Sequence, residues 1–87
     1  MAMVTVNDLV ESALLTSHHI ANLTDSAEAV RARQQLLKSQ HANDRLKKMQ
    51  YLEEARQSLE IGRMEHPGLA GQFDEALKKV KEAYDSV

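Results

Sequence analysis

The side chains that could do chemistry in this 87-residue chain are its four histidines, its carboxylates and its arginines. His18 and His19 are adjacent, so they point about 100° apart on a helix and cannot share one face. His41 and His66 fall in separate connections, and no histidine lies three or four residues from another. Because a structural zinc site needs about four converging ligands, this spacing does not favour a metal site.

A catalytic arrangement is not predicted either. Ser17 and His18 are direct neighbours, which is not the geometry in which a base orients a nucleophile. No carboxylate stands in an otherwise apolar stretch, the setting that suits acid–base catalysis. The three glycines do not form a phosphate-binding loop; they are Gly62, Gly68 and Gly71. We therefore expect no catalytic residue, no metal and no cofactor.

Three arginines are the most informative feature of the chain. Arg45, Arg56 and Arg63 fall on one helical row that they share with Leu52 and Leu59. In one interpretation their stems cover apolar surface while the guanidinium groups reach water. In the other they pair with carboxylates of a partner subunit, where arginine offers bidentate geometry. The sequence leaves both interpretations open.

The row belongs to a central helix that is predicted over residues 43–61. Its apolar side chains fill about half of the helical circumference, which suits a helix contacted by two neighbours. They are Leu46, Met49, Leu52, Ala55 and Leu59. Gly62 predicts the end of this helix.

Two helices are predicted before it. Thr5 followed by Asp8 resembles a capping box and opens a helix over residues 6–22. Asp25 with Glu28 is a second start signal, for a helix over residues 26–40. Its large apolar residues are few, so we expect it to be the loosest helix unless a partner covers it. The polar stretch that follows predicts a break, with Asn43 or Asp44 as the N-cap of the central helix.

A closing helix is predicted over residues 69–86. His66 precedes Pro67, which disfavours helical backbone at this point and marks a turn. From Leu69 onward, apolar residues lie within an arc of about 120°, the pattern of an amphipathic helix. We expect this helix to fold back antiparallel on residues 43–61.

Composition predicts an all-α fold, a small antiparallel bundle of three to four helices in a single domain over residues 1–87. Helix formers dominate, and no alternating β-branched run occurs. Only one Phe and two Tyr are present, so the core is small, and such domains often complete their burial as homodimers. The residues predicted to serve packing and self-association are Arg45, Leu46, Met49, Leu52, Arg56, Leu59, Arg63, Phe73, Leu77, Val80 and Tyr84.

Charge is unevenly distributed although the net charge is only −2. Residues 1–30 carry −4, residues 31–50 carry +5 and residues 51–87 carry −3. This predicts that the acidic first third docks on the basic middle. An alternative is that the stretch 31–48 contacts nucleic-acid phosphates. We favour that alternative less, because the stretch has no interleaved aromatic residues for stacking on bases.

The location is expected to be cytoplasmic, without membrane insertion. Cysteine is absent, so nothing in the composition points to an oxidising compartment. The first ten residues have no basic region and contain Asp8, unlike a signal peptide. No apolar run approaches the roughly 20 residues that span a bilayer.

The order of these segments resembles the YlbF/YmcA family of small helical bacterial regulators. The resemblance rests on the stretches LVESALLTSHHIANL, TDSAEAV, LLKSQ, HANDRLKKMQYLEEARQSL and EHPGLAGQFDEALKKVKEAY. It implies a cytoplasmic, non-catalytic protein that self-associates and modulates a complex of endoribonuclease Y in mRNA processing. Several members have a further C-terminal helix, and some have a cysteine-bearing tail. This sequence has no cysteine, so a cluster-binding role is not implied.

Overall fold

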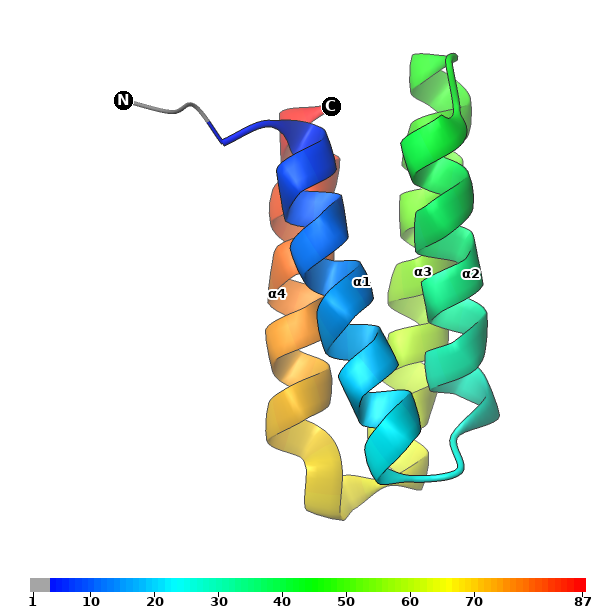
Figure 1. Cartoon of the computed structure of the whole chain (residues 1–87), viewed down its shortest axis with the longest axis vertical. Helices are drawn as coiled ribbons and strands as arrows, with labels where there is room; N and C mark the ends of the chain where they lie inside the picture. Colours follow the sequence, from blue (N-terminus) through cyan, green and yellow to red (C-terminus); the bar gives the residue numbers. More distant parts are fainter. Residues whose placement is uncertain (1–3) are drawn as a thin grey trace.

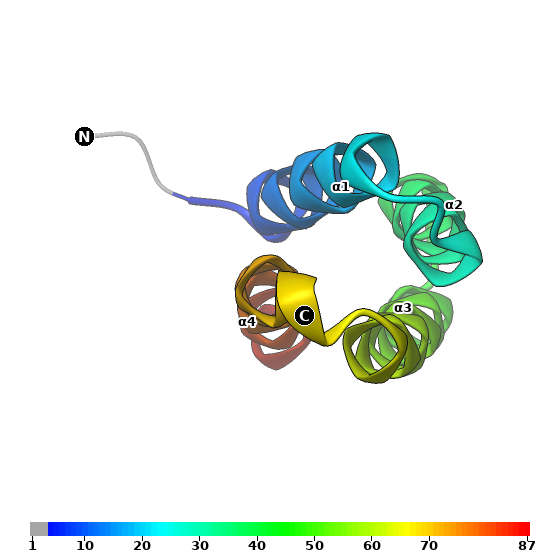
Figure 2. The ribbon, with the colours of Figure 1, turned by 90° about the horizontal axis from the view of Figure 1, so that it is seen from below.

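Four helices run alternately up and down in a computed structural model, which describes residues 4–87 (Figure 1). They are α1 (Val6–Leu23), α2 (Ala27–His41), α3 (Arg45–Glu65) and α4 (Ala70–Ser86), with a short 3₁₀ turn, η1 (Pro67–Leu69), before α4. Seen end-on, the helices form a ring in chain order, and each contacts the two beside it (Figure 2). The predicted all-α antiparallel bundle is confirmed, with four helices.

Side chains cap the starts of the first three helices. Thr5 and Asp8 form the predicted capping box. The backbone N–H of Thr5 donates to the Asp8 carboxylate at 3.0 Å, and the backbone N–H of Asp8 donates to the Thr5 hydroxyl at 3.1 Å. Asp44 accepts from the N–H of Leu46 at the start of α3, so the predicted break before α3 is confirmed. The cap of α2 differs from the prediction. Ser26, and not Asp25, is the N-cap, and its hydroxyl accepts a hydrogen bond from the backbone N–H of Ala29.

The core fills the centre of the ring with side chains from all four helices. Ile20 of α1, Leu36 of α2, Leu52 and Leu59 of α3 and Phe73 of α4 are fully buried. Alanines are buried between them on every helix, which lets neighbouring backbones approach closely. α3 packs against both α2 and α4, as its wide apolar arc predicts.

The predicted end of the central helix is wrong. α3 does not stop at Ile61 but continues to Glu65, and Gly62 is buried inside it. A Cβ atom on Gly62 would lie 2.5 Å from Cε1 and 2.9 Å from Cζ of Phe73, so glycine is needed here for packing. α3 ends where Pro67 excludes helical backbone at His66, whose φ and ψ are −126° and 69°.

Within residues 4–87, the side-chain contacts that join α1 to the basic middle are hydrogen bonds and not ion pairs. Gln40 donates to Glu11 at 2.7 Å, and Lys48 donates to Asn7 at 2.8 Å. Among residues 4–87, the one ion pair across this division, Arg31 with Glu28 at 3.6 Å, lies within α2.

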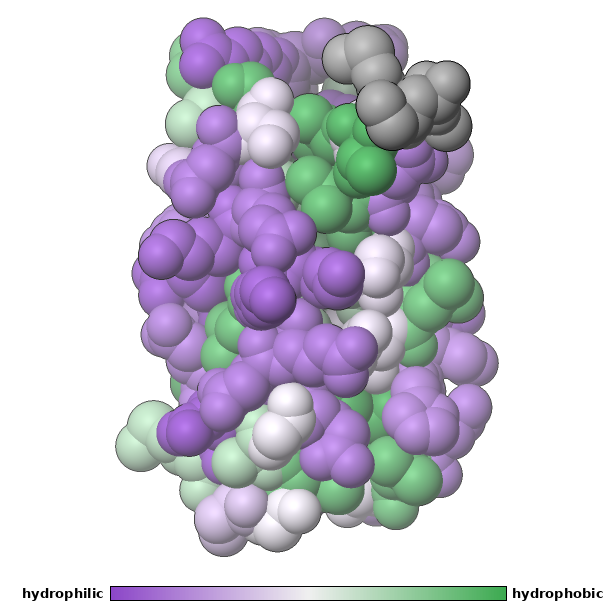
Figure 3. Space-filling view, turned by 90° about the vertical axis from the view of Figure 1, so that its left-hand side faces the viewer, coloured by the Kyte–Doolittle hydropathy of each residue, from purple (hydrophilic) through white to green (hydrophobic). Residues whose placement is uncertain are grey.

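The side of the bundle formed by α1 and α4 is mostly hydrophilic, with a narrow band of hydrophobic side chains along its length (Figure 3).

Replacement of Gly62 by alanine should destabilise the bundle. Overpacking against Phe73 costs about 1–3 kcal/mol, which outweighs a helix-propensity gain of up to about 1 kcal/mol. Gly71 is the matched control, because a Cβ atom added to it would meet no other atom within 4 Å. We expect urea unfolding to show a lower free energy of unfolding for Gly62→Ala and an equal or higher one for Gly71→Ala. Equal stabilisation by both changes would contradict the packing role of Gly62.

Candidate functional site

The three predicted arginines lie along the edge of α3 that faces α4. Arg63 donates from Nε to Oδ1 of Asp74 at 2.6 Å, near the start of α4. Arg45 donates from Nε and Nη2 to the backbone oxygen of Val87, at 3.2 and 3.1 Å. These two arginines therefore connect α3 to both ends of α4 within one chain.

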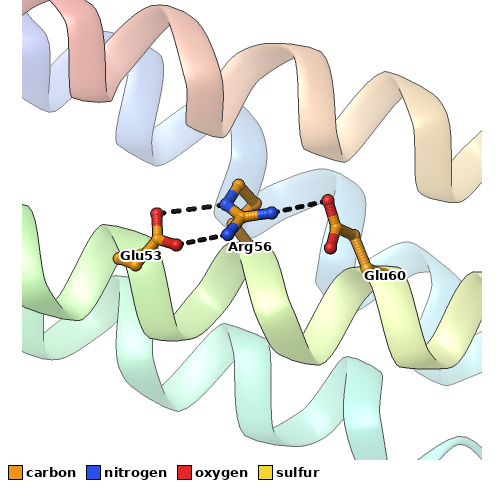
Figure 4. Close-up of polar contacts among 3 residues, drawn as sticks. All are labelled: Glu53, Arg56 and Glu60. Atoms are coloured by element: carbon orange, nitrogen blue, oxygen red, sulfur yellow. Dashed lines mark hydrogen bonds and ion pairs between the residues drawn. The ribbon is translucent and has the colours of Figure 1, made fainter.

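Arg56, the middle arginine, contacts its own helix instead (Figure 4). Its Nε donates to Oε2 of Glu53 at 3.0 Å, and its Nη2 donates to the other oxygen of the same carboxylate. On the opposite side, Nη1 donates to Glu60 at 2.6 Å. Contacts among residues 4–87 thus use three of its five N–H groups, which leaves two for a partner.

The two glutamates and the arginine stabilise one another's charge. The hydrogen bonds from Arg56 lower the pKa of Glu53 below its usual 4.5, against a smaller opposing effect of desolvation. Hydrogen bonds to Glu53, and then to Glu60, raise the pKa of Arg56 above its usual value. All three side chains remain more than one-third exposed, so the stabilisation is modest in water.

Beside this cluster lies a hollow of about 230 Å³, here named the α3/α4 groove. Leu52 and Val80 are buried at its floor, and Tyr84 is 37 % exposed. Its remaining lining residues are charged and come from both helices: Glu53, Arg56, Lys81 and Asp85. The groove combines an apolar floor with a rim that carries two charges of each sign.

The residues predicted for self-association divide into two sets. Four of them are core residues that contact other helices of the same chain: Leu52, Leu59, Phe73 and Val80. The remaining seven lie wholly or partly at the surface: Arg45, Leu46, Met49, Arg56, Arg63, Leu77 and Tyr84. The structure brings Leu52, Arg56, Val80 and Tyr84 together at the groove, whereas Leu46 is 72 % exposed and outside its lining.

Sequence reasoning missed the charged residues around Arg56. Glu53 and Glu60 stand three residues before and four residues after it, the spacing at which helical side chains meet. That signal was available from the sequence. Lys81 and Asp85 could not be found in this way, because their place at the groove depends on how α4 packs on α3.

The histidines do not gather at a site. Within residues 4–87 no group of three or more His, Cys, Asp or Glu side chains is placed to hold a metal ion. His66 stacks on Phe73, with ring centroids 6.4 Å apart and ring planes 9° apart. None of the described helices has the length and apolar character needed to cross a membrane.

Comparisons of the chain with protein-family models, with curated proteins and with solved structures found no match. The resemblance to the YlbF/YmcA family therefore stays a prediction, based on the order of helices and on the residues between them.

We expect the contribution of Glu53 to stability to depend on pH. Because its pKa is lowered in the folded chain, Glu53 stabilises the fold above its unfolded pKa, and this is lost as pH falls through the folded pKa. Glu53→Gln should lower the free energy of unfolding by up to about 1 kcal/mol at pH 7, and the loss should disappear once the pH has fallen below the lowered pKa of Glu53. Urea unfolding at several pH values measures this.

Glu54→Gln is the control for this change. Glu54 is the next residue on α3 and has no ion pair among residues 4–87. Its substitution should change stability by a similar small amount at neutral and acid pH. If the two variants show the same dependence on pH, Arg56 does not stabilise the Glu53 carboxylate in solution.

Proposed function

We propose that this protein is a non-catalytic adaptor that acts by helix-mediated association, and that its α3/α4 groove binds a second copy of the chain. The observation that supports this is the rim of the groove, where Tyr84 is 37 % exposed and lies beside the partly exposed Arg56, above the buried Leu52 and Val80. Tyrosine and arginine are enriched among the residues that contribute most to protein–protein binding.

The charges of the rim suit a contact between identical surfaces. α3 supplies Glu53 and Arg56, and α4 supplies Lys81 and Asp85, so each helix carries one charge of each sign. In a two-fold dimer the same patch meets itself, and a patch with balanced charge can pair without net repulsion. The guanidinium of Arg56 donates to two glutamates, and contacts among residues 4–87 leave two of its N–H groups to donate.

The process that such an adaptor serves follows from the family resemblance alone. On that resemblance we propose that the protein modulates an endoribonuclease Y-type complex in mRNA processing. A pull-down with purified endoribonuclease Y tests this part separately from self-association.

Binding of nucleic acid by the whole stretch 31–48 is the weaker candidate. Arg45 and Lys48 donate hydrogen bonds to Val87 and Asn7, and Arg31 pairs with Glu28. Three of the six basic side chains in this stretch are therefore engaged in contacts with other residues of the same chain.

A charge placed in the groove should abolish self-association. Tyr84→Asp introduces a carboxylate among apolar partner atoms, where an unpaired buried charge costs several kcal/mol. We expect sedimentation equilibrium to show a concentration-dependent dimer for the unchanged chain and a monomer for Tyr84→Asp. Arg56→Ala should weaken the dimer more than Arg63→Ala, because Arg63 contacts Asp74 of its own chain.

Leu15→Asp is the matched control. Leu15 is 58 % exposed on α1, outside the groove, so this variant should associate as the unchanged chain does. Circular dichroism should show that every variant retains its helices. A monomer at all concentrations for the unchanged chain, or equal weakening by Tyr84→Asp and Leu15→Asp, would contradict the proposal.

A further inference from the structure

A second and larger hollow lies away from the α3/α4 groove, where α2 ends and α3 begins (upper end of α2 and α3 in Figure 1). It measures about 560 Å³ and is here named the α2–α3 hollow. Sites for small ligands occupy about 300–1,000 Å³, so its size suits a molecule as large as a nucleotide.

Basic side chains with no ion pair gather at this hollow. Lys38 and Lys47 both line it, and within residues 4–87 neither forms a salt bridge. His41 lies between them in sequence and lines it as well. The one carboxylate in the lining, Asp44, accepts a hydrogen bond from the backbone of Leu46, so it is engaged in capping α3. The hollow thus carries an excess of positive charge.

The rest of the lining is suited to a flat, partly polar ring. Tyr51 is half-buried and Leu37 is 36 % exposed, so both offer apolar surface to a ligand. Asn43 adds an amide that can donate and accept. Aromatic side chains of this kind stack on nucleobases, and amides bond to their edges.

We infer that the α2–α3 hollow binds a nucleoside phosphate, either a free nucleotide or the 5′-phosphorylated end of a single-stranded RNA. Each lysine ammonium has three N–H donors and no acceptor, which suits the oxygens of a phosphate. Lys38 and Lys47 hold the phosphate, and Tyr51 with Leu37 holds the base. This site uses different residues from the α3/α4 groove and does not depend on self-association.

Nuclear magnetic resonance titration of the full chain tests the site with defined probes. Adenosine 5′-monophosphate should produce saturable shifts in residues 37–51, whereas adenosine and inorganic phosphate should bind more weakly, because each makes only part of the contacts. Short adenylate RNAs with a 5′-phosphate or a 5′-hydroxyl show whether the site binds the end of an RNA or a free nucleotide. Tighter binding of the phosphorylated RNA than of the mononucleotide assigns the site to RNA ends, and the reverse assigns it to free nucleotides.

Matched variants distinguish a specific phosphate-binding site from general electrostatic attraction of anions to the protein. Removal of both charges by Lys38→Gln and Lys47→Gln should lower affinity about tenfold, because two charge-assisted hydrogen bonds are lost. Lys78→Gln with Lys79→Gln removes the same charge from α4 and should leave affinity unchanged. Tyr51→Leu should make the mononucleotide bind no more tightly than inorganic phosphate, because the stacking of the base on the tyrosine ring is lost. No saturable shift at millimolar mononucleotide, or equal weakening by both double variants, would overturn the inference.

Discussion

Contact between Phe73 and Gly62 sets how closely the last two helices can approach. The Phe73 ring is fully buried, and the space that it occupies is the space a side chain at position 62 would need. Because α3 is helical through this glycine, its last turn reaches the proline that forces the chain to reverse. The height at which α4 begins, and therefore which of its residues meet α3, depends on this contact.

The arginine row depends on that register. With α4 in place, Arg45 and Arg63 reach opposite ends of α4, whereas Arg56 faces the middle and turns to glutamates of its own helix. Exposed pairs of this kind each contribute at most about 1 kcal/mol, so burial of the core supplies most of the stability. Their effect is chiefly geometric, because Arg45 and Arg63 connect α3 to both ends of α4. Between them, Arg56 has two N–H groups that no residue within 4–87 accepts.

The bundle presents two hollows of different chemistry. The α3/α4 groove has an apolar floor and balanced charge, whereas the α2–α3 hollow has a tyrosine beside two lysines that form no ion pair within residues 4–87. The first suits another polypeptide and the second suits an anion with a ring. They are formed by different faces of α3, since Leu52 and Tyr51 differ by about 100° around the helix. One helix can thus contribute to two contacts that do not compete for the same side chains.

Local features of the amino-acid sequence predict the helical class, the capping of α1 and α3 and the turn at Pro67. These features depend on local spacing and on proline, whose effects reach only a few residues along the chain. The pairing of Arg56 with Glu53 and Glu60 is also a local feature, because these residues are three and four positions apart on one helix. In contrast, the packing of α4 on α3 is needed to see that Gly62 contacts Phe73 and that Lys81 and Asp85 border the groove. Both depend on which residues of α4 lie opposite α3, and contacts between distant segments leave no periodic signal in either segment alone.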